Sequence, residues 1–182
     1  MASLGAVHPD LIPELETARL RLRRLDPADA GLLGLYAADA RVARMTTTIP
    51  HPFPPGGAEA FVARVTGPAS AETARALDTG GENGLIGVIS VKPAGPGVLG
   101  LGYWVAPAFW NAGYASEAVE AVAAELARQG GWEAATAEVF QDNVASARVL
   151  TRAGFAFEGE GEAHSVARGA MVPTFRYRRS LQ

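Results

Sequence analysis

The chain has 182 residues, 48% of them hydrophobic and 19% charged, which is enough for one globular domain with a substantial core. Its formal net charge of −3 gives no general attraction to nucleic acid or to an anionic membrane, and it contains no cysteine, which excludes disulfides, thiolate nucleophiles and cysteine metal sites. The three histidines lack the short spacing of a helical metal pair, and no apolar run is long enough to span a bilayer. We therefore expect a soluble cytoplasmic protein that binds no metal, nucleic acid or membrane.

The first third of the chain is predicted to form one strand and two helices around a loop. In residues 18–24 leucine alternates with arginine, as in a half-buried strand. Asp26 followed by proline is typical of a helix start, and leucines continue this helix to about residue 38. Four prolines predict a loop over residues 46–57, and apolar spacing predicts a second helix over residues 58–65. Loop and second helix together are expected to flank a substrate entrance.

Strands and helices are then predicted to follow one another to the end of the chain. Glycine and proline turns separate three strands, which we interpret as an antiparallel meander over residues 74–77, 85–91 and 98–105. A stripe of small and branched apolar residues predicts a helix over residues 115–129, and a strand follows over residues 134–140.

A last helix and two strands complete the predicted order. Asp142 or Asn143 caps this helix at its start. The residues expected on its inward face are Ala145, Val149 and Ala153. The two strands are expected over residues 155–158 and 174–179. The whole order indicates a mixed sheet, not the regular strand–helix alternation of a dinucleotide-binding fold.

The turn between the meander and the helix after it is a candidate anion site. It leaves backbone N–H groups free at a helix start, where the helix dipole favours a negative charge such as a pyrophosphate. Gly113 lets a ligand approach the backbone closely, Ala115 and Ser116 are small enough not to block it, and Ser116 can also cap the helix. The pattern alone is weak, because many α/β turns look the same.

Three blocks of sequence resemble one family of enzymes. Residues 102–118 read GYWVAPAFWNAGYASEA, close to the acetyl-CoA motif G-Y-W-x-x-P-x-x-W-G-x-G-Y-A-T-E-A of RimJ/RimL-type enzymes in the GNAT superfamily. Residues 143–155 read NVASARVLTRAGF, similar to N-x-x-S-x-x-V-L-x-x-x-G-F, and residues 15–23 read LETARLRLR, similar to the family's opening L-E-T-x-R-L-x-L-R. The resemblance covers roughly residues 15 to 180 and is least typical around the proline-rich loop.

This resemblance implies an α+β sandwich, the GNAT acyl-CoA N-acyltransferase fold. The fold has a mixed, mostly antiparallel twisted sheet with splayed central strands and helices on both faces. Residues 1–14 are expected to be a tail, and residues 15–182 one acetyltransferase domain. The oligomeric state stays open between a monomer and a homodimer.

The resemblance also implies where acetyl-CoA binds. The pantetheine arm lies between the splayed strands, and the N–H of Val105 or Ala106 polarises the thioester carbonyl. Asn143 positions the pantetheine or the amine, and Ser146, the implied catalytic residue, donates a hydrogen bond to the leaving sulfur. Backbone amides hold the pyrophosphate; they belong to Asn111, Ala112, Gly113, Tyr114, Ala115 and Ser116.

Two positions depart from what this family usually carries. Leu150 stands where many members have a tyrosine acid, and its side chain cannot donate a proton. Gly100 stands where a carboxylate base is often found. The candidate bases are Glu138, Asp142, His164 or a water chain, and the C-terminal region of residues 160–168 is a further candidate to reach the cleft. The side chains of Tyr103, Trp104, Phe109 and Trp110 are either core or cofactor wall, and we favour the core, apart from packing by Trp110.

The function implied is acetyl transfer from acetyl-CoA to a primary amine by direct attack in a ternary complex. The acceptor is either a protein N-terminus or a small-molecule amine. The missing carboxylate and hydroxyl keep a second possibility open, a non-catalytic acetyl-CoA-binding sensor or scaffold, because a fold and a bound cofactor do not guarantee chemistry.

Overall fold

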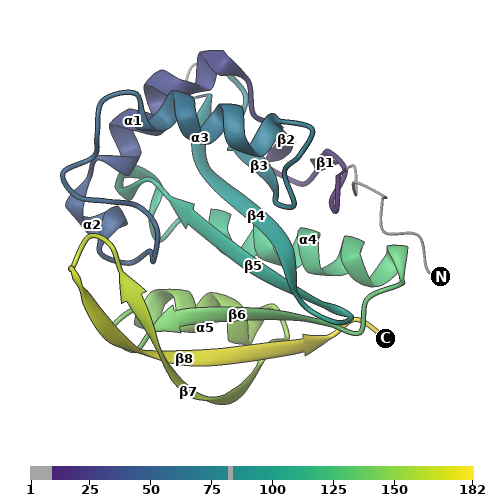
Figure 1. Ribbon diagram of the computed structural model, residues 1–182. Coiled ribbons are helices and arrows are strands. Elements are labelled where there is room, and N and C mark those ends of the chain that lie inside the picture. Colours follow the sequence, from purple (N-terminus) through teal and green to yellow (C-terminus); the bar gives the residue numbers. More distant parts are fainter. Residues whose placement is uncertain (1–9, 82–83) are drawn as a thin grey trace.

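The computed structural model describes residues 10–81 and 84–182, which form an eight-stranded sheet with helices on both faces (Figure 1). In chain order the strands are β1 (Leu15–Glu16), β2 (Arg21–Arg24), β3 (Thr73–Asp78), β4 (Leu85–Gly95), β5 (Val98–Val105), β6 (Ala134–Phe140), β7 (Ala156–Ser165) and β8 (Ala170–Ser180). The helices are α1 (Ala30–Ala37), α2 (Ala40–Ala43), α3 (Gly57–Thr66), α4 (Tyr114–Gln129) and α5 (Val144–Arg152), with 3-10 turns at Pro27–Asp29 and Pro107–Phe109.

Two neighbouring strands part in the middle of the sheet. The order is β1-β2-β3-β4-β5-β6-β8-β7, and every pair is antiparallel except β5 with β6. That parallel pairing covers only Val98 to Gly100 on β5, opposite Ala134 to Thr136 on β6. Beyond this point the strands diverge, as Figure 1 shows. The expected mixed sheet with splayed central strands is confirmed.

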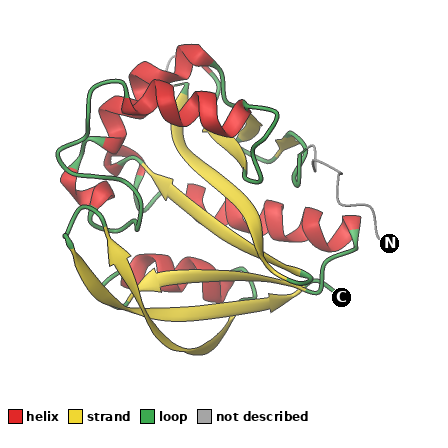
Figure 2. Cartoon of the chain, viewed as in Figure 1, coloured by secondary structure: helices red, strands yellow, loops and turns green. Residues whose placement is uncertain are grey.

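The helices divide between the two faces of the sheet (Figure 2). α1 and α3 pack together over β3 and β4, around a smaller core that includes Leu33 and Val62. α4 and α5 cover the other face over β5 and β6, in the larger core. The predicted stripe of α4 is confirmed, since its four apolar residues are fully buried: Val119, Val122, Ala123 and Leu126.

The predicted inward face of α5 is partly wrong. Ala153 is buried and Val149 half-buried as expected, but Ala145 is exposed and the fully buried residue is Leu150. At about 100° per residue, Leu150 lies roughly 140° around the helix from Ala145, so the two cannot share one face. The helix therefore turns Leu150, not Ala145, toward the sheet.

Other elements differ in length from the prediction. The first predicted strand, residues 18–24, is shortened to β2, because Thr17 N–H bonds to the Leu20 carbonyl at 2.8 Å and makes a turn before it. The two-residue strand β1, which precedes this turn, was not predicted. The short helix α2 was not predicted. β7 and β8 run to 10 and 11 residues, longer than expected, since β7 is an edge strand with exposed side chains and no buried alternation to reveal it.

Part of the predicted tail packs with the core. Leu11 and Ile12 are buried, and the Leu11 N–H bonds to Thr73 Oγ1 at 2.9 Å. The guanidinium of Arg75, itself 2% exposed, donates to the carbonyls of Ile12 and Pro13. The rest of the predicted tail, residues 1–9, lies outside the described residues.

Within residues 10–81 and 84–182, no helix has both the length and the apolar character that crossing a bilayer requires.

A close contact between β4 and β5 supplies the first testable prediction. A Cβ added at Gly87 would lie 2.3 Å from the Trp104 carbonyl oxygen and 3.0 Å from Val105 Cα. We expect Gly87→Ala to lower the free energy of unfolding by more than about 2 kcal/mol, because the backbone of β5 must shift to make room. Chemical denaturation of purified protein measures this.

Gly31→Ala is the matched control for that substitution. Gly31 is exposed in α1, and a Cβ there meets nothing within 4 Å. It should therefore leave stability unchanged or raise it by up to about 1 kcal/mol, as alanine does in a helix. Equal effects of the two substitutions would show that the β4–β5 contact does not require glycine.

Candidate active site

The turn before α4 has the geometry expected of an anion site. Asn111 and Gly113 have φ values of 60° and 85°, so the chain passes twice through the left-handed region before α4 begins at Tyr114. The first backbone bond of this helix runs from Glu117 N–H to the Gly113 carbonyl, so the amides that precede it have no intrahelical partner. The structure thus brings the predicted residues 111–116 into one turn and helix start. Ser116 lies inside the helix, whose N-cap is Gly113, so the expectation that Ser116 caps it is wrong.

The opening segment of the chain fastens this turn. Glu117, in the first turn of α4, accepts hydrogen bonds from Thr17 Oγ1 at 2.6 Å and from Arg19 N–H and Nε at 2.8 Å. Arg19 also donates to the Ala112 carbonyl at 2.8 Å and lies over the Tyr114 ring. Burial raises the pKa of Glu117, but the bonds from Thr17 and Arg19 outweigh it and keep that pKa below the ordinary value of glutamate. Two of the three family-like blocks therefore touch each other here.

The divergence of β5 and β6 selects one of the two candidate oxyanion donors. Ala106 N–H already bonds to the Ile86 carbonyl of the β4 side at 2.8 Å, so it is not available. Successive N–H groups of a strand point to opposite edges, so the N–H of Val105 points away from β4, toward the gap left by β6. The Val105 carbonyl accepts Trp110 Nε1–H at 2.6 Å, which holds the start of the turn against the strand.

A pair of hydroxyl groups bridges β5 and α5. Asn143 is the N-cap of α5, as predicted, and its Oδ1 accepts the Ser146 N–H at 3.1 Å. Ser146 Oγ donates to Tyr103 Oη at 2.8 Å, and Tyr103 Oη donates to the Ser146 carbonyl at 3.1 Å. Burial raises the pKa of the Tyr103 phenol above its ordinary value, so the phenol stays protonated at neutral pH.

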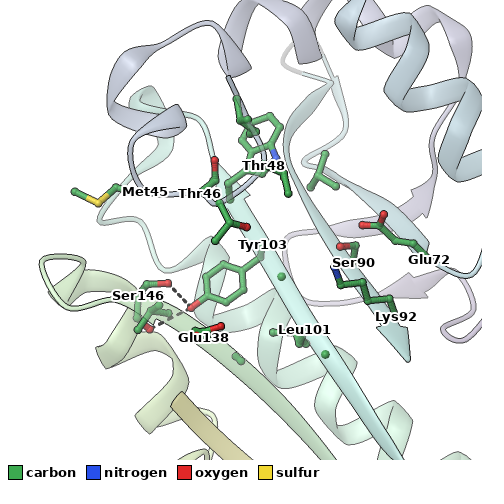
Figure 3. A pocket seen from close by; sticks show the side chains of 18 of the residues that line it. Met45, Thr46, Thr48, Glu72, Ser90, Lys92, Leu101, Tyr103, Glu138 and Ser146 are labelled. Atoms are coloured by element: carbon green, nitrogen blue, oxygen red, sulfur yellow. Dashed lines mark hydrogen bonds between the residues drawn. The ribbon is translucent and has the colours of Figure 1, made fainter. Parts of the chain in front are cut away.

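Tyr103 is the site residue that the sequence reasoning missed. The sequence favoured the core for its side chain, and the side chain does pack against the larger core, but it also lines the cavity together with Ser146 (Figure 3). Strand alternation places Tyr103 on the same edge and face as Val105, two residues on. Because this strand was expected to border a gap, the two-residue spacing from Val105 could have indicated that Tyr103 lies beside the same gap.

A cavity of about 930 Å³ lies on the α1 and α3 side of the sheet, and both helices contribute to its lining. Its walls come from β4, β5 and β6, and the proline-rich loop contributes Thr46, Thr48 and Phe53. The loop thus borders a cavity, as expected of a substrate entrance. Of the predicted site residues, Ser146 lines this cavity, whereas Asn143, Val105 and the turn at 111–116 lie outside its lining.

The candidate bases fall in different places. Glu138 lines the cavity. Asp142 accepts two hydrogen bonds from Arg168, at 2.8 and 3.0 Å, and His164 is exposed on β7; neither lines the cavity. Gly100 lines it as well, opposite Lys92 of β4.

Arg168, at the tip of the β7–β8 hairpin, joins that hairpin to the segment before the proline-rich loop. It donates to the Arg44 carbonyl at 2.9 Å, pairs with Asp142 and lies over the Phe140 ring at 4.8 Å. The neighbouring Val166 N–H bonds to the Thr47 carbonyl at 3.1 Å. We call Arg168, Val166 and their partners the clasp.

These features, a splayed mixed sheet with a helix start beside the gap, are those of an acyl-CoA N-acyltransferase. The sequence model of a family described as acetyltransferase (GNAT) domain matches residues 19–156. The chain therefore belongs to the GNAT acetyltransferases, and the expectation of an enzyme that takes its acetyl group from acetyl-CoA is confirmed.

Solved structures of acetyltransferases share the fold along nearly the whole chain. RimL, a ribosomal L7/L12 α-N-protein acetyltransferase solved with coenzyme A, has a TM-score of 0.75 and 21% identity over 93% of this chain and 97% of that one. The ribosomal-protein-S5-alanine acetyltransferase of Vibrio fischeri has a TM-score of 0.79 and 18% identity, over 94% of this chain and 98% of that one. Spermidine N-acetyltransferase of Vibrio cholerae, solved with CoA and spermine, has a TM-score of 0.75 and 14% identity, over 90% of this chain and 96% of that one. A search of curated proteins found no match.

The clasp supplies a prediction about pH. The hydrogen bonds from Arg168 lower the pKa of Asp142, against the smaller opposing effect of burial. A carboxyl whose pKa is lower in the folded state stabilises that state above its unfolded pKa of about 4 and loses the contribution as pH falls through the folded pKa. We expect Asp142→Asn to lower the melting temperature at neutral pH, and the difference from wild type to vanish in acid.

Thermal unfolding followed by circular dichroism over a series of pH values measures that difference. Glu160→Gln, which removes an exposed carboxyl of β7, is the control and should leave the profile unchanged. A difference between wild type and Asp142→Asn that persists unchanged into acid would contradict the ion-pair explanation.

Proposed function

We propose that the chain transfers the acetyl group of acetyl-CoA to a primary amine in a ternary complex, with Val105 N–H and the Ser146 hydroxyl at the reacting bond. The observation that carries this proposal is the gap between β5 and β6, because its β5 wall offers the Val105 amide and the Tyr103–Ser146 hydrogen bond links that same strand to α5. The thioester is the chemistry that acetyl-CoA supplies when bound.

The donor fits the residues that surround the gap. The amides of the turn at 111–116 suit a diphosphate, since helix starts and left-handed turns present N–H groups to anions. Arg19 brings a positive charge to the same turn, 47% of its side chain being exposed. Asn143 orders the start of α5, which borders the gap.

Ser146 is proposed to hand a proton to the leaving sulfur. Its hydroxyl donates to the Tyr103 oxygen, while Tyr103 donates to the Ser146 carbonyl. Rotation of two O–H bonds reverses this arrangement: Ser146 then points its hydrogen at the sulfur, and Tyr103 donates to Ser146 Oγ. No heavy atom has to move, which makes the pair a pre-organised proton donor.

The charges that line the cavity favour an acceptor with one amine over a polyamine. Positive and negative side chains are equal in number, namely Arg64, Lys92 and Arg176 against Glu72, Glu138 and Glu158. A polycation binds best where negative charge is in excess, so we propose a protein N-terminus or a small monoamine. The structural relatives that act on ribosomal proteins support the first choice. A cytoplasmic location and a homodimer remain predictions.

Ser146→Ala tests the proposed acid. We expect kcat to fall by about 100-fold, the low end of general acid–base catalysis, while the dissociation constant for acetyl-CoA stays within a factor of two or so. Calorimetry measures the affinity, and release of the CoA thiol measures turnover with peptides that begin with alanine or serine and with simple amines. Thr151→Ala, an exposed hydroxyl on the same helix, is the control and should change neither quantity.

The same assay separates the enzyme from a sensor or scaffold. Tight binding of acetyl-CoA without thiol release from any amine would favour the non-catalytic function, whereas no binding at all would overturn both. Equal losses of affinity and rate in Ser146→Ala would show that Ser146 binds the donor and does not transfer a proton.

Tyr103→Phe tests the reversal of the hydroxyl pair. The ring still fills its place, but Ser146 loses the hydroxyl that donates to it when its own hydrogen turns to the sulfur. We expect kcat to fall by about 3- to 10-fold, corresponding to one hydrogen bond, with KM for acetyl-CoA unchanged. An unchanged kcat in steady-state kinetics would assign Tyr103 to packing alone.

A further inference from the structure

We infer that Glu138, on β6, takes the proton from the acceptor amine, an assignment that rests on the proposed acetyl transfer. Glu138 lies two residues beyond Thr136, the last residue of β6 that pairs with β5, so it stands where the gap opens. It lines the same cavity as Tyr103 and Ser146, and Figure 3 shows these three at one end of it. Its strand is the wall opposite Gly100, where the resemblance places a base that this chain lacks.

The other acidic and basic candidates fail on position or on pairing. Asp142 and His164 do not line the cavity, and both carboxylate oxygens of Asp142 are bonded to Arg168. Glu72 lines it but forms an ion pair with Arg64 at 2.6 Å, and Figure 3 places Glu72 away from Ser146.

Two further charged groups on the cavity wall are also unsuited to the role. Glu158 lies on the edge strand β7, where it faces Arg178 at 4.0 Å. Lys92 stands opposite Gly100 on β4, so a cation occupies the position across from the one where a base was expected. Glu138 is therefore the carboxylate on this wall that the described residues leave without a cationic partner within ion-pair distance.

Neighbouring strands hold the Glu138 carboxylate in a defined place. Thr174 Oγ1 on β8, which is 1% exposed, donates to Glu138 Oε1 at 2.5 Å. Gly161 on β7 leaves the room for this bond, because a Cβ there would lie 3.1 Å from both oxygen atoms. The described residues place no hydrogen-bond donor on Oε2, so that oxygen remains available to an ammonium group in the cavity.

Charged and titratable groups of three neighbouring strands line the same cavity as Glu138. Arg176 is its cross-strand partner on β8 and also lines the cavity, Glu158 lies on β7, and Tyr103 lies on β5. Positive and negative charge thus flank the carboxylate together. An ammonium group can approach without meeting an excess of positive charge.

The proton balance uses Glu138 and Ser146 in turn. Glu138 Oε2 takes one proton from the ammonium ion, which frees the nitrogen lone pair to form the N–C bond at the thioester carbonyl. The Val105 N–H stabilises the negative charge that develops on the carbonyl oxygen. As the C–S bond breaks, the sulfur leaves with the bonding electrons and receives the Ser146 proton. The second proton released by the nitrogen restores the serine hydroxyl, and Glu138 returns its proton to water.

Glu138→Gln tests this assignment through the pH dependence of the rate. With a peptide that carries a free alanine N-terminus, kcat/KM should fall about 100-fold or more at neutral pH. The loss should shrink above the pKa of about 8 of an α-amino group, because the peptide then arrives already deprotonated. Acetyl-CoA affinity by calorimetry should not change. Glu162→Gln, an exposed carboxyl on β7 outside the cavity lining, is the matched control.

Thr174→Val tests whether Glu138 acts as a base or only links β6 to β8 through its hydrogen bond with Thr174. It removes the bond between Thr174 and Glu138 but keeps the carboxylate, so the rate should fall less and the pH profile should keep its shape. A wild-type rate in Glu138→Gln would overturn the assignment and leave the acetyl transfer intact. So would a loss that is the same at every pH or that comes with weaker acetyl-CoA binding. An inactive wild type that takes up no acetyl-CoA would instead overturn the proposed function, and this assignment with it.

Discussion

The divergence of β5 and β6 is the constraint on which the rest of the site depends. A sheet normally satisfies its backbone groups by pairing, and here pairing stops after Gly100 and Thr136, which leaves one edge of β5 open toward Val105. The open edge costs stability unless another group bonds to it, and that unmet hydrogen-bonding capacity is what a pantetheine arm and a thioester carbonyl can use. Strand β4 keeps its own pairing with β5 throughout, so the edge stays in register while the gap widens.

Contacts between distant segments hold the gap in this shape. Thr17 and Arg19 bind Glu117 at one end of it, and Trp110 bonds back to the strand it follows. On the other side, Asn143 orders α5 and brings Ser146 to Tyr103. Two of these contacts, those of Glu117 with the opening segment and that of Ser146 with Tyr103, join residues from separate sequence blocks, so the resemblance of those blocks to one family has a common physical basis in the site.

The sequence allowed the fold and much of the donor side of the site to be predicted, because both depend on local patterns. Periodicity located α4 and β6, and the motif located the turn at Gly113. The long hairpin of β7 and β8 was underestimated, since β7 is an exposed edge strand and carries no buried alternation. The role of Tyr103 depends on which strand edge borders the gap, and that is a tertiary fact. The choice between Val105 and Ala106 needed the pairing with Ile86, which the sequence does not contain.

The clasp has a consequence for how new acceptors can be recruited. The floor of the cavity is made of strands, whereas its roof is the segment around Thr46 to Phe53. This segment is held by the backbone bond from Val166 to Thr47 and by packing of Ile49 and Phe53 on the smaller core, and Arg168 binds the Arg44 carbonyl just before it. Residues of the roof make none of the hydrogen bonds that position Ser146, Tyr103 or Glu138. Substitutions or length changes confined to the roof therefore reshape the cavity without disturbing the hydrogen bonds of Ser146, Tyr103 and Glu138. If the proposed roles of these residues hold, the range of acceptors and the chemistry can evolve separately in this chain.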